Sequence, residues 1–204
     1  MNIERLVEAF KSGQTYSEYR EMLDKLLAEG KTTGPDQSES MIDYASLNNK
    51  RMDRGDKTVK VDDATKAVLD SVPGENWLVL TEGWCGDASQ ILPTLSKLEE
   101  ASENISMRLI LRDENPDIMD EFTTNGTRSI PKIIRLNSDF TEVLGSWGPR
   151  PKAMQALVDE WKKTPEVPKS EMYAKVHGAY AKDRGKQTIA EIVNFLEQTH
   201  NQTV

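Results

Sequence analysis

The sequence predicts an α/β fold, and two observations carry this prediction. From residue 77 onward, short apolar runs typical of buried strands alternate with longer segments whose apolar residues recur at helical spacing. Their order is strand, helix, strand, helix, a pair of close strands and a further helix. The length of 204 residues, 37% of them hydrophobic, allows one sizeable core with helical additions at both ends.

Residues 1–57 are predicted to form a helical extension at the N-terminus. An amphipathic helix opens the chain, and Thr15 with Glu18 has the spacing of a capping box for a second one. Gly30 is suited to end that second helix. After a polar loop, a third helix is expected over about residues 39–54.

Residues 58–163 hold the predicted α/β domain, which begins with a helix capped by Asp62. A turn at Asn137-Ser-Asp139 separates its two close strands. The elements that follow the first helix are expected, in chain order, to be a strand at Trp77–Leu80, a helix from Ala88, a strand at Ile105–Leu111, a helix from Pro116 to about Gly126, strands at Lys132–Leu136 and Phe140–Leu144, and a helix burying Met154, Leu157, Val158 and Trp161.

Residues 164–204 are predicted to form a C-terminal helical pair packed on the same domain. A linker with two prolines spans residues 163–169, and a helix follows around residues 172–184. Thr188 and Glu191 have the spacing of a capping box for the last helix.

Charge and composition argue against several classes of function. There are 26 Lys and Arg against 34 Asp and Glu, so the net charge of −8 makes nucleic acid an unexpected partner. The first ten residues carry acids and lack the basic start of a signal peptide, and no apolar run suggests a membrane span. A single cysteine excludes an internal disulfide and a metal site with several thiolate ligands, which fits a cytoplasmic protein. We expect no metal and no cofactor.

Two motifs at characteristic spacing carry a resemblance. The first is Trp84-Cys85-Gly86-Asp87-Ala88 after a strand, with Pro93 eight residues beyond the cysteine, and the second is Gly126-Thr-Arg-Ser-Ile130-Pro131. Together they resemble the active site of the thioredoxin superfamily, and the chain is most similar to bacterial thioredoxin-like proteins with a Trp-Cys-Gly-Asp loop. The resemblance covers about residues 58–163. It implies a thioredoxin fold, in which helices flank a central mixed sheet and a cis Pro131 faces Cys85.

Cys85 is the candidate nucleophile. It lies at a strand-to-helix junction, where backbone N–H groups and the helix dipole stabilise a thiolate. Asp87 and Glu82 lie close in sequence, and their charges are expected to raise the pKa of the thiol again. Arg128 or Arg51 would counter these charges if the fold brought either of them near.

Two residues that a dithiol enzyme needs are replaced. Ala88 occupies the position of the resolving cysteine, which would attack the mixed disulfide. Val79 stands where thioredoxins usually have a buried aspartate. Conventional dithiol reductase activity is therefore not expected.

The other candidate site residues are predicted to contact the substrate: Trp84, Gly86, Asp87, Ile130 and Pro131. Asp87 is either a proton acceptor or simply a favourable acid in the first helical turn. Trp84 is either a platform for substrate or a packed anchor, and Pro131 either borders a peptide groove or only shapes the hairpin.

Residues outside the motifs are expected to have ordinary roles. Tyr44, Asn48 and Arg51 share one face of the third helix, which we expect to be solvated or packed on another helix, although it could also border the site. His177 and His200 are expected on helix surfaces.

Two hypotheses for function remain open. In the first, the lone thiol of Cys85 forms mixed disulfides with a protein or a low-molecular-weight thiol or disulfide, as a monothiol redox enzyme would. In the second, the chain is a non-catalytic binding or adaptor module that uses the groove beside the cis-proline. Whether the chain is an enzyme depends on which hypothesis holds.

Overall fold

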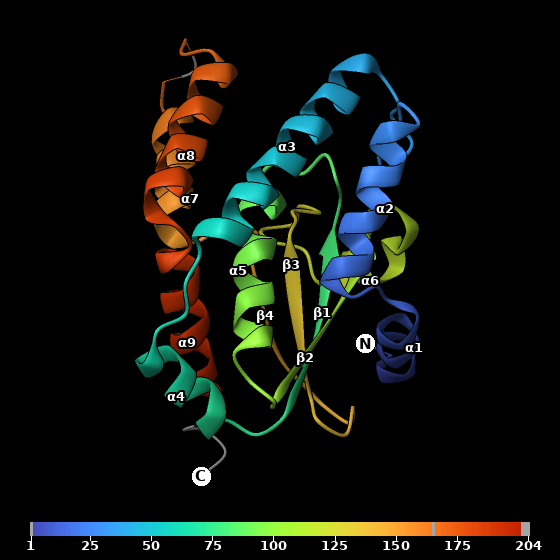
Figure 1. Cartoon of the computed structure of the whole chain (residues 1–204), viewed down its shortest axis with the longest axis vertical. Coiled ribbons are helices and arrows are strands. Elements are labelled where there is room, and N and C mark those ends of the chain that lie inside the picture. The colour runs from blue at the N-terminus through green and yellow to red at the C-terminus, as the bar shows by residue number, and fades with distance from the viewer. Residues whose placement is uncertain (1, 165, 201–204) are drawn as a thin grey trace.

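The computed structural model describes residues 2–164 and 166–200, and within them the predicted α/β thioredoxin fold is confirmed (Figure 1). Four strands of this described part form one mixed sheet in the order β2-β1-β3-β4. Strand β1 is parallel to β2 and antiparallel to β3, and β3 is antiparallel to β4. Their bounds are β1 Glu75–Thr81, β2 Ile105–Leu111, β3 Lys132–Asn137 and β4 Val143–Trp147.

Helices cover the sheet and extend beyond it (Figure 1). Helix α5 connects β1 to β2 and contacts α3 and α9, whereas α1 and α2 contact β2. The helices are α1 Ile3–Ser12, α2 Tyr16–Ala28, α3 Glu39–Thr58, α4 Asp63–Ser71, α5 Ala88–Glu100, α6 Pro116–Glu121, α7 Lys152–Trp161, α8 Lys169–Asp183 and α9 Lys186–His200, with a 3-10 turn η1 at Arg112–Glu114.

The sheet centre and α5 form the core that carries the site. Every residue of β1 is buried, because the strand is paired on both sides and covered on both faces. Helix α3 approaches α5 closely at Gly55, where an added Cβ would lie 2.7 Å from the ring of Pro93. Glycine at this position therefore lets α3 lie directly against the helix that follows Cys85.

A buried ion pair joins the sheet to the C-terminal helices. The guanidinium of Arg135 on β3 donates to both carboxylate oxygens of Glu75 on β1. It also lies 4.4 Å from the ring centroid of Phe195 and donates to that residue's carbonyl, 3.2 Å away on α9. The last helix is thus tied to the back of the same core.

Most local signals in the sequence are confirmed. Thr15 and Glu18 form the reciprocal capping box of α2, and Asp62 accepts from the Thr65 N–H at the start of α4. Gly30 follows α2 with a φ of +68°, the left-handed conformation that glycine adopts easily. The predicted connection between α7 and α8 also falls where it was expected.

Three predicted boundaries are wrong. Helix α3 continues to Thr58 because Gly55 packs against α5 rather than breaking the helix. Helix α6 ends early, at Glu121, well before Gly126. Strand β4 begins at Val143, because Phe140 has a φ of +61° and belongs to the turn.

The predicted capping box of the last helix is also wrong. Helix α9 begins at Lys186, so Thr188 lies inside it and is buried. Glu191 accepts instead from the backbone N–H of Lys152, 2.6 Å away, and from the indole N–H of Trp147, 3.1 Å away. A tertiary contact has replaced the local one.

Candidate functional site

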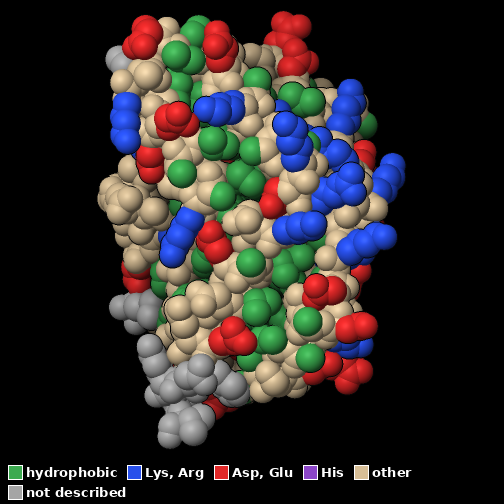
Figure 2. Space-filling model, turned by 90° about the vertical axis from the view of Figure 1, so that its left-hand side faces the viewer, with side chains coloured by type: hydrophobic (Ala, Val, Ile, Leu, Met, Phe, Trp, Pro, Cys, Tyr) green, Lys and Arg blue, Asp and Glu red, His purple; other side chains and the backbone are tan. Residues whose placement is uncertain are grey.

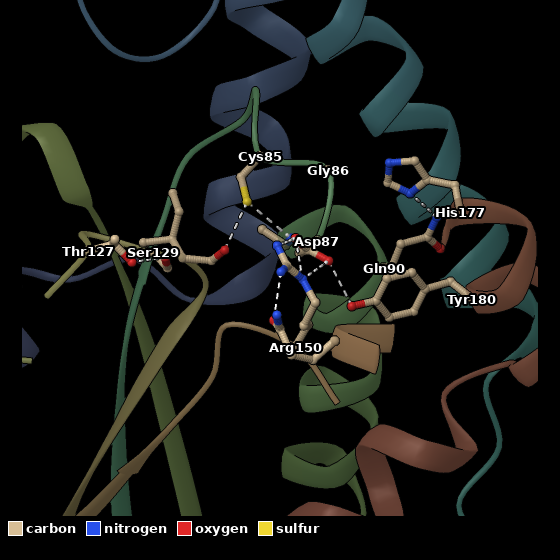
Figure 3. Close-up of polar contacts among 12 residues, drawn as sticks. Cys85, Gly86, Asp87, Gln90, Thr127, Ser129, Arg150, His177 and Tyr180 are labelled. Carbon is tan, nitrogen blue, oxygen red and sulfur yellow. Dashed lines mark hydrogen bonds and ion pairs between the residues drawn. The ribbon is translucent and has the colours of Figure 1, made fainter. Parts of the chain in front are cut away.

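Cys85 lies in the short connection between β1 and α5, as the motif predicts. Its Sγ accepts the backbone N–H of Ala88 at 3.4 Å, which is the expected interaction with a helix N-terminus. The same thiol donates to the carbonyl oxygen of Ile130, 3.3 Å away on the segment before β3. Cys85 is 7% exposed, so the thiol is held on two sides and almost covered (Figure 3).

The surroundings of Cys85 favour the neutral thiol. Burial is the largest effect and, with repulsion from Asp87 second, raises the pKa of the thiol to about 12; the Ala88 N–H acts in the opposite direction. The sequence indicated the repulsion from Asp87, whereas the burial follows from the fold. Glu82 is also buried, and its carboxylate accepts the Asp113 N–H at 2.9 Å.

Asp87 is neutralised by a residue that the sequence analysis did not identify. Arg150, after β4, donates from Nε and Nη2 to its carboxylate, with the shortest distance 2.6 Å. Tyr180 of α8 donates its hydroxyl to the same carboxylate at 2.9 Å. The expectation that Arg128 or Arg51 would counter this charge is wrong, because Arg128 pairs with Asp120 and Arg51 donates to Asn48.

His177 is not the surface residue that the sequence suggested. It is 9% exposed, and its two ring nitrogens lie 3.2 Å from the Tyr44 hydroxyl and 3.2 Å from the Gln90 amide nitrogen. Burial, followed by the charge of Arg51, lowers the pKa of His177 to about 4, so the ring is neutral at physiological pH. The side chain of His200 lies outside the described residues.

Helices α3 and α8 pack closely against the Cys85 loop at Gly86. A Cβ at this position would lie 2.6 Å from the Tyr44 hydroxyl and 2.8 Å from Cε1 of His177. Gly86 is therefore required by close packing, in addition to any contact with substrate. Helix α8 thereby forms one wall beside Cys85.

The opposite wall comes from the segment before β3. The peptide bond between Ile130 and Pro131 is cis, as the resemblance implies. Ile130 and Ser129 line the cavity described below, and Pro131 is buried. Figure 3 shows Ser129 and Thr127, whose hydroxyls are 2.7 Å apart, on the side of Cys85 away from His177.

Helix α3 takes part in the site, an arrangement that the sequence analysis judged less favoured than packing or solvation. Asn48 is fully buried and donates to the Gly83 carbonyl at 3.0 Å, which holds the loop before Trp84. Tyr44 lines the cavity, and the guanidinium of Arg51 lies 5.4 Å from the centroid of its ring.

A cavity of about 720 Å³ opens between these walls, within the size range of ligand sites. Cys85, Gly86 and Asp87 line it, and Figure 3 shows them between Ser129 of the segment before β3 and His177 of α8. Trp84 also lines it and is half-buried, with the Arg112 guanidinium 4.6 Å from its ring. The remaining lining residues are Ser40, Met41, Tyr44, Arg112, Arg128, Ser129, Ile130, Arg150, Val158, Trp161, Lys169, Met172, Tyr173, Val176 and His177.

The two replaced positions are filled by core packing. Ala88 is 1% exposed at the start of α5, and Val79 is fully buried in β1.

Among residues 2–164 and 166–200, no cluster of His, Cys, Asp and Glu has the arrangement of a metal site. No helix in the same part of the chain combines the length and apolarity needed to cross a membrane.

The fold and the Cys85 loop define a protein of the thioredoxin superfamily, and sequence comparison gives the family. The family model described as Thioredoxin matches residues 34–162, so the chain belongs to the thioredoxin family. That match begins before α3, within the segment predicted as an N-terminal extension. No curated protein matches significantly.

Two solved structures share the fold over nearly the whole chain. One is a protein of unknown function from Pseudomonas aeruginosa, with a TM-score of 0.57 and 17% identity over 94% of this chain and 96% of that one. The other is an HIV epitope scaffold, with a TM-score of 0.56 and 18% identity over 94% and 97%. At these identities the similarity concerns the fold alone.

Proposed function

We propose that this protein is a thioredoxin-fold binding module that holds an extended segment of a partner protein in the cleft beside Cys85, without turnover of the thiol. One observation carries the proposal: Cys85 lines a cavity of about 720 Å³, yet its thiol is almost completely buried and hydrogen-bonded to Ile130 and Ala88. Burial raises the pKa of this thiol to about 12. Such a thiol is almost wholly protonated at neutral pH and is a poor nucleophile. The cavity around it nevertheless has the size of a binding site.

The lining supports a peptide as the ligand. Trp84 of the Cys85 loop and Tyr173 of α8 offer aromatic surface to the cleft, and aromatic side chains bind well where one end of the side chain meets water and the rest meets apolar groups. Ser129 and Ile130, directly before the cis bond to Pro131, also line the cleft, and we expect an extended chain to lie beside them.

The monothiol hypothesis, which the sequence analysis placed first, is the second candidate. It is favoured by the Ala88 N–H bonded to Sγ and by the opening of the cleft onto Cys85. In that reaction the Cys85 thiolate attacks one sulfur of a partner disulfide, and the other sulfur leaves as a thiolate that takes up a proton. A second thiol must then release the partner, since Ala88 cannot.

Capture of partners from a cell extract by the immobilised protein distinguishes the two functions. The binding module predicts that Cys85→Ala captures the same proteins as the wild type and that Tyr173→Ala loses them. Leu47→Ala is the matched control, because Leu47 is exposed to a similar extent and does not line the cleft. Capture that disappears in Cys85→Ala and reverses with reductant would instead establish the monothiol function.

A further inference from the structure

The cleft is cationic although the protein is acidic. Four cations line it, namely Arg112, Arg128, Arg150 and Lys169, while the whole chain has a net charge of −8. Within the described part of the chain, Asp87 is the single acidic lining residue. Its carboxylate is bound by Arg150 and Tyr180, so Asp87 and Arg150 neutralise each other, and the excess of positive charge in the lining comes from Arg112, Arg128 and Lys169.

Basic side chains are unevenly distributed on the molecular surface. Figure 2 shows the face that carries the C-terminal helices, where many Lys and Arg side chains gather on the upper right, whereas Asp and Glu are spread over the face with groups near the top and the bottom. A local excess of one charge inside a concave site concentrates ligands of the opposite charge.

Two cations of the lining lie over aromatic rings. The Arg112 guanidinium, on η1 after β2, lies 4.6 Å from the centroid of the Trp84 ring, and the Lys169 ammonium lies 5.3 Å from the centroid of the Tyr173 ring on α8. Arg112 pairs with Asp113 and Arg128 pairs with Asp120, and neither of these acids is part of the lining. Lys169 is exposed, and no ion pair of its ammonium is found among residues 2–164 and 166–200, so its three N–H donors are available to a ligand.

The interior between the walls is apolar. It is lined by Met41, Ile130, Val158, Met172 and Val176. A ligand that binds both the cations and the apolar side chains of the lining must carry anionic groups beside apolar ones. Methionine adapts to apolar side chains of different shapes, which suits a peptide surface.

From this arrangement we infer that the cleft binds an extended acidic segment of a partner protein, in which carboxylates alternate with apolar side chains. The inference rests on the proposed binding function and names its ligand. Successive side chains of an extended chain point in opposite directions, so the apolar side chains can face the interior while the carboxylates lie on the other face, within reach of the exposed cations Arg128 and Lys169.

Fluorescence anisotropy with defined peptides tests the inference on the full-length protein. The acidic probe is an N-acetylated, C-terminally labelled hexapeptide of alternating glutamate and leucine, and the matched probe has glutamine for glutamate. We expect the acidic probe to bind at least tenfold more tightly, and its advantage to shrink as salt is added. Lys169→Glu is expected to weaken binding of the acidic probe by about fivefold and to leave binding of the glutamine probe unchanged.

Two comparisons make each outcome decisive. Lys66→Glu on α4 makes the same change in net charge outside the cleft, and it should bind both probes as the wild type does. Equal binding of the two probes by the wild type, or equal weakening by Lys66→Glu and Lys169→Glu, overturns the acidic ligand but leaves the binding module standing. If neither probe binds, the inference is overturned, and capture of partners dependent on Tyr173 then decides the proposed function separately.

Discussion

Alkylation of Cys85 as a function of pH tests how the fold has altered this thiol. The perturbation is a rise in pH, and the assay follows addition of iodoacetamide to the intact protein by mass spectrometry. The protein has one cysteine, so every adduct on sulfur reports the same site. A short peptide containing one cysteine is the reference thiol.

The magnitude follows from the fraction of thiolate. With a pKa of about 12, Cys85 is ionised to about one part in 10,000 at about pH 8, whereas an unperturbed thiol with a pKa of ~8.5 is about one-quarter ionised. Cys85 should therefore react roughly two thousandfold more slowly than the peptide. Its rate should rise about tenfold for each pH unit up to about pH 11, whereas the peptide reaches a plateau above about pH 9.

Unfolding provides the control. In concentrated urea the burial and the repulsion from Asp87 are lost, so the rate of the denatured chain should match the peptide. A native Cys85 whose rate reaches a plateau near pH ~8.5, or that reacts as fast as the peptide, would refute the argument from burial and would favour the monothiol function.

Three further substitutions test the site. Asp87→Asn should shift the alkylation profile of Cys85 to lower pH, because it removes the repelling charge, and an unchanged profile would contradict this. The same substitution should lower the free energy of unfolding in urea by about 2 kcal/mol, because charge-assisted hydrogen bonds are lost. Gly86→Ala should cost about 1–3 kcal/mol because its Cβ clashes, whereas Gly178→Ala in α8 has open space and should stabilise by up to about 1 kcal/mol; equal effects would contradict the packing. Burial raises the pKa of Glu82, so the folded state binds more protons and stability falls as pH rises from the unfolded pKa of about 4.5 through the folded value. Glu82→Gln should remove this fall in urea titrations at several pH values, and a fall that persists would show that another group causes it.

Local residue chemistry was sufficient to predict much of the fold. Two helix starts were predicted from capping residues, Asp62 for α4 and the pair Thr15 and Glu18 for α2. Such caps can be read from sequence because a side-chain oxygen accepts a backbone N–H within three residues of itself. The buried strand β1 and the start of α5 follow from apolar runs and spacing. The two motifs around Cys85 and Pro131 together indicate the superfamily, and the resemblance implies the cis bond before Pro131 that the structure contains.

Local residue chemistry failed to predict helix boundaries and caps where contacts between distant segments compete with local ones. Glu191 has the spacing of a capping residue, yet it binds Trp147 and Lys152. The third helix was expected to end near residue 54, yet α3 continues to Thr58 through Gly55, which packs against Pro93 of α5. In both cases the competing partner is distant in sequence, so no local pattern could reveal it.

By itself the sequence determined the class of fold, the lone cysteine and the absence of a resolving thiol at position 88, because these depend on residue type and short spacing. Only the tertiary structure decided the chemistry of the site. The partner that neutralises Asp87 is Arg150, 63 residues away, and His177 meets Gln90 across 87 residues. Burial of the Cys85 thiol and the cationic cleft above it likewise arise from segments brought together by folding, since desolvation and charge depend on distance in space.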